Sequence, residues 1–191
     1  EVSSAEPLAV LSANAGSVWS VSFDSTSDTV AMGAEDGSLR LWDLPTGEPG
    51  RTLTGHTQRP TALAFSPDGA LLATAAGDRK VRIWNPRTGG TPLVLTNPDT
   101  PAESVAFAPD GATLATVDGH GRARVWDAGS GAELLTFRAN DEYELTRSIT
   151  YSPDGTVLAT GDDLGLLRTW DAATGAARLT AFAVVGDDQR V

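Results

Sequence analysis

Short runs of apolar or alternating residues, rich in Val, Leu, Thr and aromatic side chains, recur along this chain between turns that contain Gly and Pro. This pattern is typical of β-strands. One group of four runs occupies residues 61–65, 71–75, 81–84 and 92–95. The sequence Ser-Pro-Asp-Gly at 66–69 joins the first two runs, and its proline is preset for the second position of a turn. No stretch has a convincing helical period, so we expect an all-β chain of four-stranded antiparallel meanders.

The tryptophans mark an internal repeat. Trp42, Trp84, Trp126 and Trp170 are separated by 42, 42 and 44 residues, and each is followed by Asp or Asn. The Pro-Asp-Gly turn recurs at 66–69, 108–111 and 152–155, with a degraded copy at 24–28. A further turn that contains Gly follows each tryptophan. A period of about 40 to 45 residues indicates a propeller or a solenoid array.

The second repeat carries Gly55-His56, the Ser-Pro-Asp-Gly turn, Asp78, and Trp84 followed by Asn, in that order. This order resembles the WD40-repeat family of β-propellers, and the resemblance extends over nearly the whole chain. It implies a hydrogen-bonded structural tetrad within the blade, formed by His56, Thr74, Asp78 and Trp84. A catalytic relay of histidine, aspartate and hydroxyl is the alternative. We reject the relay because Thr74 lies inside a predicted strand, where a substrate has no access.

The tetrad is expected to be incomplete in the other repeats. Met32 stands at the hydroxyl position of the first repeat, His120 at the aspartate position of the third, and Leu164 at that of the fourth, next to Asp163. Losing a whole buried network costs less than losing half of one. We therefore expect blade stability to rest mainly on the apolar stripe of the first strands, which is Val21, Phe23, Leu63, Phe65, Val105, Phe107, Ile149 and Tyr151.

The repeat divides the chain into four blades. We expect them at 13–54, 55–96, 97–138 and 139–183, with the outer strand of a preceding blade at 1–12 and a loop toward a further blade at 184–191. Propellers close with about four to eight blades, but a closed ring of four would leave the strand at 1–12 without a blade, so we interpret the chain as an incomplete ring from a larger WD40 propeller in a multidomain protein. A start at Glu1 rather than at methionine fits a processed or excised chain. The alternative is a self-assembling half-propeller that closes an eight-blade ring as a homodimer through its open blade edges.

Composition narrows the classes of function. The 191 residues include 25 Asp and Glu against 14 Lys and Arg, for a net charge of −11, which argues against nucleic acid or a membrane as partner. The chain has no cysteine and only two histidines, so thiol catalysis, disulfides and a histidine-rich metal site are excluded. No candidate catalytic, cofactor or metal-binding group emerges. We expect a non-enzymatic chain, and the lack of cysteine and of a signal peptide suggests the cytoplasm.

The WD40 resemblance implies a rigid platform that binds proteins or peptides on one face. The apolar spacing of Val18, Val21 and Phe23 departs from strict alternation, and a β-bulge between Val18 and Val21 would turn Trp19 toward that face. Exposed Trp and Arg are frequent interface anchors, which makes Trp19, Arg59 and Arg147 the leading candidates. The other candidate partner-binding residues are Glu35, Glu103, Asp163 and Tyr143. The alternative for Trp19 is that it continues the core stripe.

The loop at 138–146 is two residues longer than its equivalents and contains the acidic run Asp-Glu-Tyr-Glu at 141–144. Such a run either binds a basic peptide or is simply a solvated loop. Three classes of function remain: a binding or scaffold module, a self-assembling structural protein, and a propeller enzyme with a polar cluster on its top face.

Overall fold

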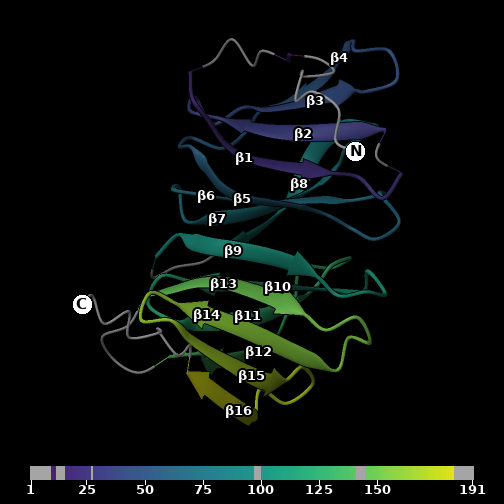
Figure 1. Ribbon diagram of the computed structural model, residues 1–191. Coiled ribbons are helices and arrows are strands. Elements are labelled where there is room, and N and C mark those ends of the chain that lie inside the picture. The colour runs from purple at the N-terminus through teal and green to yellow at the C-terminus, as the bar shows by residue number, and fades with distance from the viewer. Residues whose placement is uncertain (1–9, 12–15, 27, 97–99, 141–144, 183–191) are drawn as a thin grey trace, which may run out of the picture.

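The computed structural model describes residues 10–11, 16–26, 28–96, 100–140 and 145–182. It contains four antiparallel sheets of four strands each, and in every sheet the strands lie side by side in the order of the chain (Figure 1). The fold is therefore all-β, as the sequence predicts, and the arrangement is that of a partial propeller with four blades.

The strand bounds are as follows. Blade 1 consists of β1 (Val18–Phe23), β2 (Thr29–Ala34), β3 (Leu39–Asp43) and β4 (Pro49–Leu53). Blade 2 consists of β5 (Pro60–Phe65), β6 (Leu72–Ala76), β7 (Lys80–Asn85) and β8 (Gly89–Thr96). Blade 3 consists of β9 (Ala102–Phe107), β10 (Thr113–Asp118), β11 (Arg122–Asp127) and β12 (Glu133–Arg138). Blade 4 consists of β13 (Thr146–Tyr151), β14 (Val157–Asp162), β15 (Leu166–Asp171) and β16 (Ala177–Phe182).

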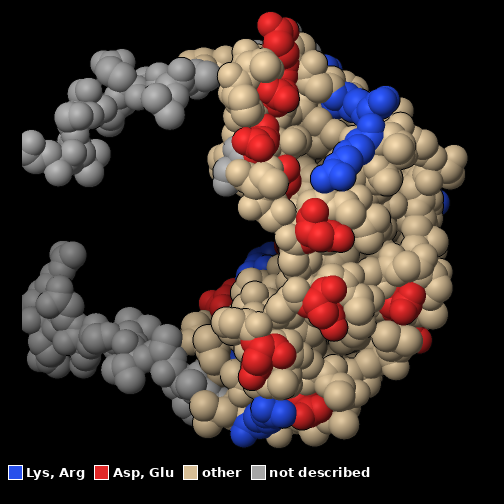
Figure 2. Space-filling view, turned by 90° about the vertical axis from the view of Figure 1, so that its right-hand side faces the viewer, with Lys and Arg blue, Asp and Glu red and all other residues tan. Residues whose placement is uncertain are grey.

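The described residues form an open crescent in Figure 2. The first strands of neighbouring blades, β1, β5, β9 and β13, lie next to one another. In each blade, the turn between the first and second strands and the turn between the third and fourth strands lie at the same end. We call this end the bottom face, and it faces the viewer in Figure 2. The opposite end, with the second-to-third loops and the connections between blades, is the top face.

Each interior junction between blades is an apolar layer built in the same way. One blade contributes residues of its later strands, and the next contributes its first strand and its tryptophan, so that Trp84 packs with Leu39 and Leu53, and Trp126 with Val81 and Leu95. At the third junction the rings of Phe137 and Trp170 lie 5.1 Å apart, centroid to centroid. Burial of these side chains is the main stabilising contribution between blades.

The two end faces of the crescent have no covering strand among the described residues, although Leu11 packs against Met32 and Ala34 of blade 1. Val21 and Phe23 were expected to hold blade 1 together, but they are 58% and 57% exposed. The prediction fails because this stripe packs against a preceding blade, and the structure describes no strand there. At the other end, Leu167 and Leu179 of blade 4 are also exposed.

The expected outer strand at 1–12 lies largely outside the described residues. The two residues that are described there, Val10 and Leu11, do not belong to a strand. The predicted loop at 184–191 lies wholly outside the described part of the chain. Within that part, no helix is long and apolar enough to cross a membrane.

Candidate functional site

A β-bulge interrupts the first strand of every blade near its top end. In blade 1 the register shifts between Val18 and Ser20, so Trp19 is the extra residue. The shifts in the other three blades leave Thr61, Glu103 and Arg147 as the extra residues. A bulge re-aims the side chain that it carries. These are the four positions that the sequence spacing marks as equivalent.

Trp19 is the centre of a polar and aromatic cluster on the top face. The residue is 48% exposed, and its Nε1 donates a hydrogen bond to Glu35 Oε2 at 2.7 Å. The guanidinium carbon of Arg59, from blade 2, lies 3.8 Å from the ring centroid, which is a cation–π contact. Trp19 is therefore not part of the core stripe. The structure brings three of the predicted partner-binding residues together across a blade junction.

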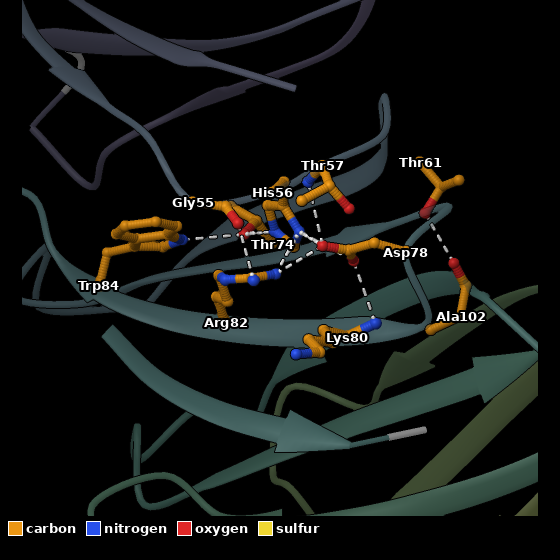
Figure 3. Close-up of polar contacts among 10 residues, drawn as sticks. All are labelled: Gly55, His56, Thr57, Thr61, Thr74, Asp78, Lys80, Arg82, Trp84 and Ala102. Carbon is orange, nitrogen blue, oxygen red and sulfur yellow. Dashed lines mark hydrogen bonds and ion pairs between the residues drawn. The ribbon is translucent and has the colours of Figure 1, made fainter. Parts of the chain in front are cut away.

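A second pair lies on the same face between blades 3 and 4. Arg147 Nη1 and Glu103 Oε2 are 3.6 Å apart, and the two side chains are partly exposed. An ion pair of this kind contributes little to stability, so both charges remain available to a partner. Thr61, the extra residue of blade 2, follows Arg59 and precedes Glu103 in the sequence. Its hydroxyl donates a hydrogen bond to the carbonyl of Ala102 at 2.6 Å (Figure 3).

The two remaining candidates have different outcomes. Asp163 is exposed, but its Oδ1 accepts the backbone N–H of Leu145 at 3.0 Å, so it fixes the loop that it faces. Tyr143 lies outside the described residues.

The predicted tetrad of blade 2 is joined by hydrogen bonds (Figure 3). The indole of Trp84 donates to Thr74 Oγ1 at 2.9 Å, and that hydroxyl lies 2.8 Å from His56 Nε2. His56 Nδ1 lies 3.1 Å from both carboxylate oxygens of Asp78. With its proton on Nδ1, the ring donates to Asp78 and accepts from Thr74, so each of these atoms has a partner.

Burial has the largest influence on the protonation of both ionisable members of the tetrad. It lowers the pKa of His56 below the ordinary value of 6.5, so the imidazole is neutral at neutral pH. Burial alone would raise the pKa of Asp78, but the interactions with His56 and Arg82 outweigh it and hold that pKa below the ordinary 3.8. The network therefore contains one buried carboxylate, which needs a positive partner.

Arg82 supplies that positive partner, and sequence reasoning missed it. Its Nη1 donates to Asp78 Oδ2 at 2.9 Å, and its Nη2 donates to the carbonyl of Gly55 at 2.8 Å. The sequence does contain a signal. An arginine stands two residues before the tryptophan of all four repeats, at 40, 82, 124 and 168.

The networks of blades 3 and 4 are rearranged rather than absent, which corrects the expectation of simple decay. Asp118 Oδ2 lies 3.4 Å from Arg124 Nη1, and Asp162 pairs in the same way with Arg168. Both aspartates end the second strand of their blade, two positions before the site where His120 and Leu164 stand. The tryptophan of each blade still donates to a threonine, Thr116 or Thr160, at 3.0 Å. Each of these two blades thus keeps the bond between tryptophan and threonine and a pair of Asp and Arg.

Blade 1 is the exception, and it leads to a prediction. Among the described residues, Trp42 Nε1 is buried without a hydrogen-bond partner, because Met32 occupies the position of Thr74. We expect the Met32→Thr variant to be more stable than its near-isostere Met32→Val by about 1 kcal/mol, since only threonine offers the indole an acceptor. Urea denaturation followed by tryptophan fluorescence measures the difference. At an ordinary buried site valine is more stable than threonine, because the threonine hydroxyl loses its contact with water. A Val variant as stable as the Thr variant would therefore contradict the prediction.

The aspartates of the polar turns stabilise those turns by hydrogen bonds to the backbone. Asp68, Asp110 and Asp154 each accept the backbone N–H two residues further on, at 2.9 to 3.0 Å, as expected of turn formers. In the described residues no cluster of three or more His, Cys, Asp and Glu could hold a metal ion.

Comparison with known families agrees with this architecture. The family model described as WD domain, G-beta repeat, matches residues 5–43, 47–85, 93–127 and 131–171. These matches cover most of the chain, which therefore belongs to the WD40-repeat family. The match at 47–85 starts before β4 and ends with β7, so one sequence repeat supplies the outer strand of one blade and three strands of the next. No curated protein sequence was found to match the chain. WD40 repeats generally mediate protein–protein interactions as non-catalytic scaffolds.

Proposed function

We propose that this chain is a non-catalytic scaffold module that binds a protein or peptide on its top face. The observation that carries the proposal is the half-exposed Trp19, held by Glu35 on one side and by the Arg59 guanidinium over its ring. Trp and Arg dominate the binding energy of many interfaces. An indole that is already ordered loses less conformational entropy on binding, which favours affinity.

The electrostatics support the choice of partner. A net charge of −11 disfavours nucleic acid and anionic membrane surfaces. The top face itself offers both signs of charge, from Glu35, Arg59, Glu103 and Arg147. We infer a polypeptide partner that contributes an apolar contact to Trp19 and charged groups of both signs. We propose that the module works in the cytoplasm.

The exposed end faces support a larger assembly. Val21 and Phe23 at one end, and Leu167 and Leu179 at the other, occupy positions that are covered at interior junctions. We propose that further blades of a multidomain protein cover them. The alternative, a homodimer of half-rings, would cover the same positions with a second copy. Light scattering over a dilution series separates the two, because only the alternative requires a stable dimer of this chain.

Binding at the top face is testable without knowing the partner. Peptides would be selected on the wild-type chain from a displayed library of short random sequences. We expect Trp19→Ala to weaken the selected peptides by about 30-fold, the effect of losing an anchor worth about 2 kcal/mol. Asp68→Asn, a change in a bottom-face turn, is the control and should leave affinity unchanged. Peptides whose affinity does not depend on Trp19 would contradict the proposal.

A further inference from the structure

The bottom face is strongly acidic along the whole crescent (Figure 2). Its turns and the strand ends beside them carry the acidic residues Asp24, Asp28, Asp43, Glu48, Asp68, Asp110, Asp127, Glu133, Asp154 and Asp171. Among the described residues, the basic side chains in the same regions are Arg51, Arg87 and Arg178. Arg178 is already bonded to Asp171 at 2.5 Å. This face therefore presents a negative field to any partner.

A groove opens on this face between blades 3 and 4. It has a volume of about 510 Å³, within the range of about 300–1,000 Å³ that is usual for ligand sites. The apolar part of its wall is formed by Pro109, Val125, Leu134, Leu135, Tyr151 and Ala172. Leu134 is 58% exposed, so its side chain is available for an apolar contact in the groove.

Two carboxylates line the same groove. Asp110 and Asp154 each use Oδ1 to accept the hydrogen bonds of their own turn. Their Oδ2 atoms have no hydrogen bond or ion pair with the described residues, and no basic side chain lines the groove there. The turn bonds from Ser152 and Thr156 lower the pKa of Asp154 to about 2, so this carboxylate stays ionised at physiological pH. The groove thus combines an apolar wall with uncompensated negative charge.

The corresponding groove between blades 1 and 2 is different. It is smaller, about 220 Å³, and Arg51 and Arg87 line it together with Trp42. Basic residues therefore compensate the acidic face at that junction, whereas the junction of blades 3 and 4 has none in its lining. The contrast singles out the second groove as a place for a cationic partner.

We propose that the groove between blades 3 and 4 docks a basic segment of a partner polypeptide. One apolar side chain of that segment enters the pocket beside Leu134 and Tyr151, and a neighbouring Arg or Lys pairs with Asp110 and Asp154. The site lies at the opposite end of the blades from Trp19, so a partner held here leaves the top face free. A second binding site would make the module bivalent. Its two faces would then bind two different polypeptides, or two segments of the same polypeptide.

The test uses a defined probe, a synthetic peptide of alternating Arg and Leu, and a matched peptide of alternating Glu and Leu. Titrations of the isotope-labelled 191-residue chain would be followed by its backbone amide NMR signals. We expect the Arg-Leu peptide to shift signals around 108–113, 134–135, 151–155 and 172–173, and the Glu-Leu peptide to shift none of them. Higher salt should weaken the binding, since screening reduces the contribution of the charges.

Two variants locate the site. Leu134→Ser and Asp110→Asn should each reduce affinity for the Arg-Leu peptide by about 10-fold, roughly 1.4 kcal/mol. Asp68→Asn removes the same charge from the equivalent turn of blade 2 and should change nothing. Equal loss in the Asp68 and Asp110 variants would mean attraction to acidic turns in general, and would overturn the proposal. So would shifts centred on Trp19 or no binding at all. The Trp19→Ala variant should bind the probe as the wild type does, so this result stands apart from the top-face test.

Discussion

Replacing Asp78 by alanine should destabilise the chain by about 3 to 5 kcal/mol. The carboxylate is the counter-charge of Arg82, and the two side chains are only 6% and 9% exposed. Its loss leaves a buried guanidinium whose bond to the carbonyl of Gly55 cannot balance the charge. His56 Nδ1 and the backbone N–H of Thr57 lose their acceptor as well. Urea denaturation measures the change in the free energy of unfolding.

The first blade offers a matched control for this substitution. Asp36 stands at the same loop position, but it is exposed, and among the described residues it accepts hydrogen bonds only from the backbone and hydroxyl of Ser38. Asp36→Ala should therefore cost about 1 kcal/mol or less, since it breaks a local turn bond only. Equal losses in the two variants would show that the buried network adds nothing. The double variant Asp78→Ala with Arg82→Met should regain part of the loss, because it leaves no buried charge.

Two neighbouring aspartates of blade 4 should differ sharply in their effect on stability. Asp162→Ala is expected to cost about 3 kcal/mol, because Asp162 pairs with the buried Arg168 and its Oδ1 holds the N–H groups of Leu164 and Leu166 at 3.1 and 2.9 Å. Asp163→Ala should cost about 1 kcal/mol or less, since among the described residues this exposed side chain accepts one backbone bond.

Thermal and urea unfolding of both variants would measure this difference. Asp162→Asn refines the comparison, because the amide oxygen can keep the loop bonds while the charge is lost, and its stability should fall between those of the wild type and Asp162→Ala. A loss for Asp163→Ala as large as that for Asp162→Ala would contradict the assignment of Asp162 as the partner of Arg168.

Much of the candidate site was predictable from local sequence. The bulge follows from the spacing of Val18, Val21 and Phe23, because three apolar residues that must share one face of a strand cannot be separated by three and then two positions without an extra residue. The tetrad of blade 2 is implied by the resemblance to WD40 repeats, and its hydrogen bonds are present in the structure. These features depend on contacts within one blade.

The arginines were missed although their spacing was visible. An arginine on a strand is usually exposed to solvent. The arginine before each tryptophan is therefore interpreted as a surface residue until its buried partner is known. Asp118 and Asp162 were missed for a related reason. They are the last residues of their strands, whereas the motif has its aspartate in the loop two positions further on. Only the packed blade shows that a carboxylate from the strand end reaches the arginine.

The sequence by itself determined the strands, the four-fold repeat, the turns and the membership in the WD40 family, because alternation and turn chemistry act over a few residues and recur at a constant period. The tertiary structure decided which side chains meet. Trp19 and Arg59 are 40 residues apart and touch only because β1 and β5 lie side by side. It also decided that Val21 and Phe23 are exposed while Leu63 and Val105 are buried, because burial of a blade face depends on whether another blade covers it.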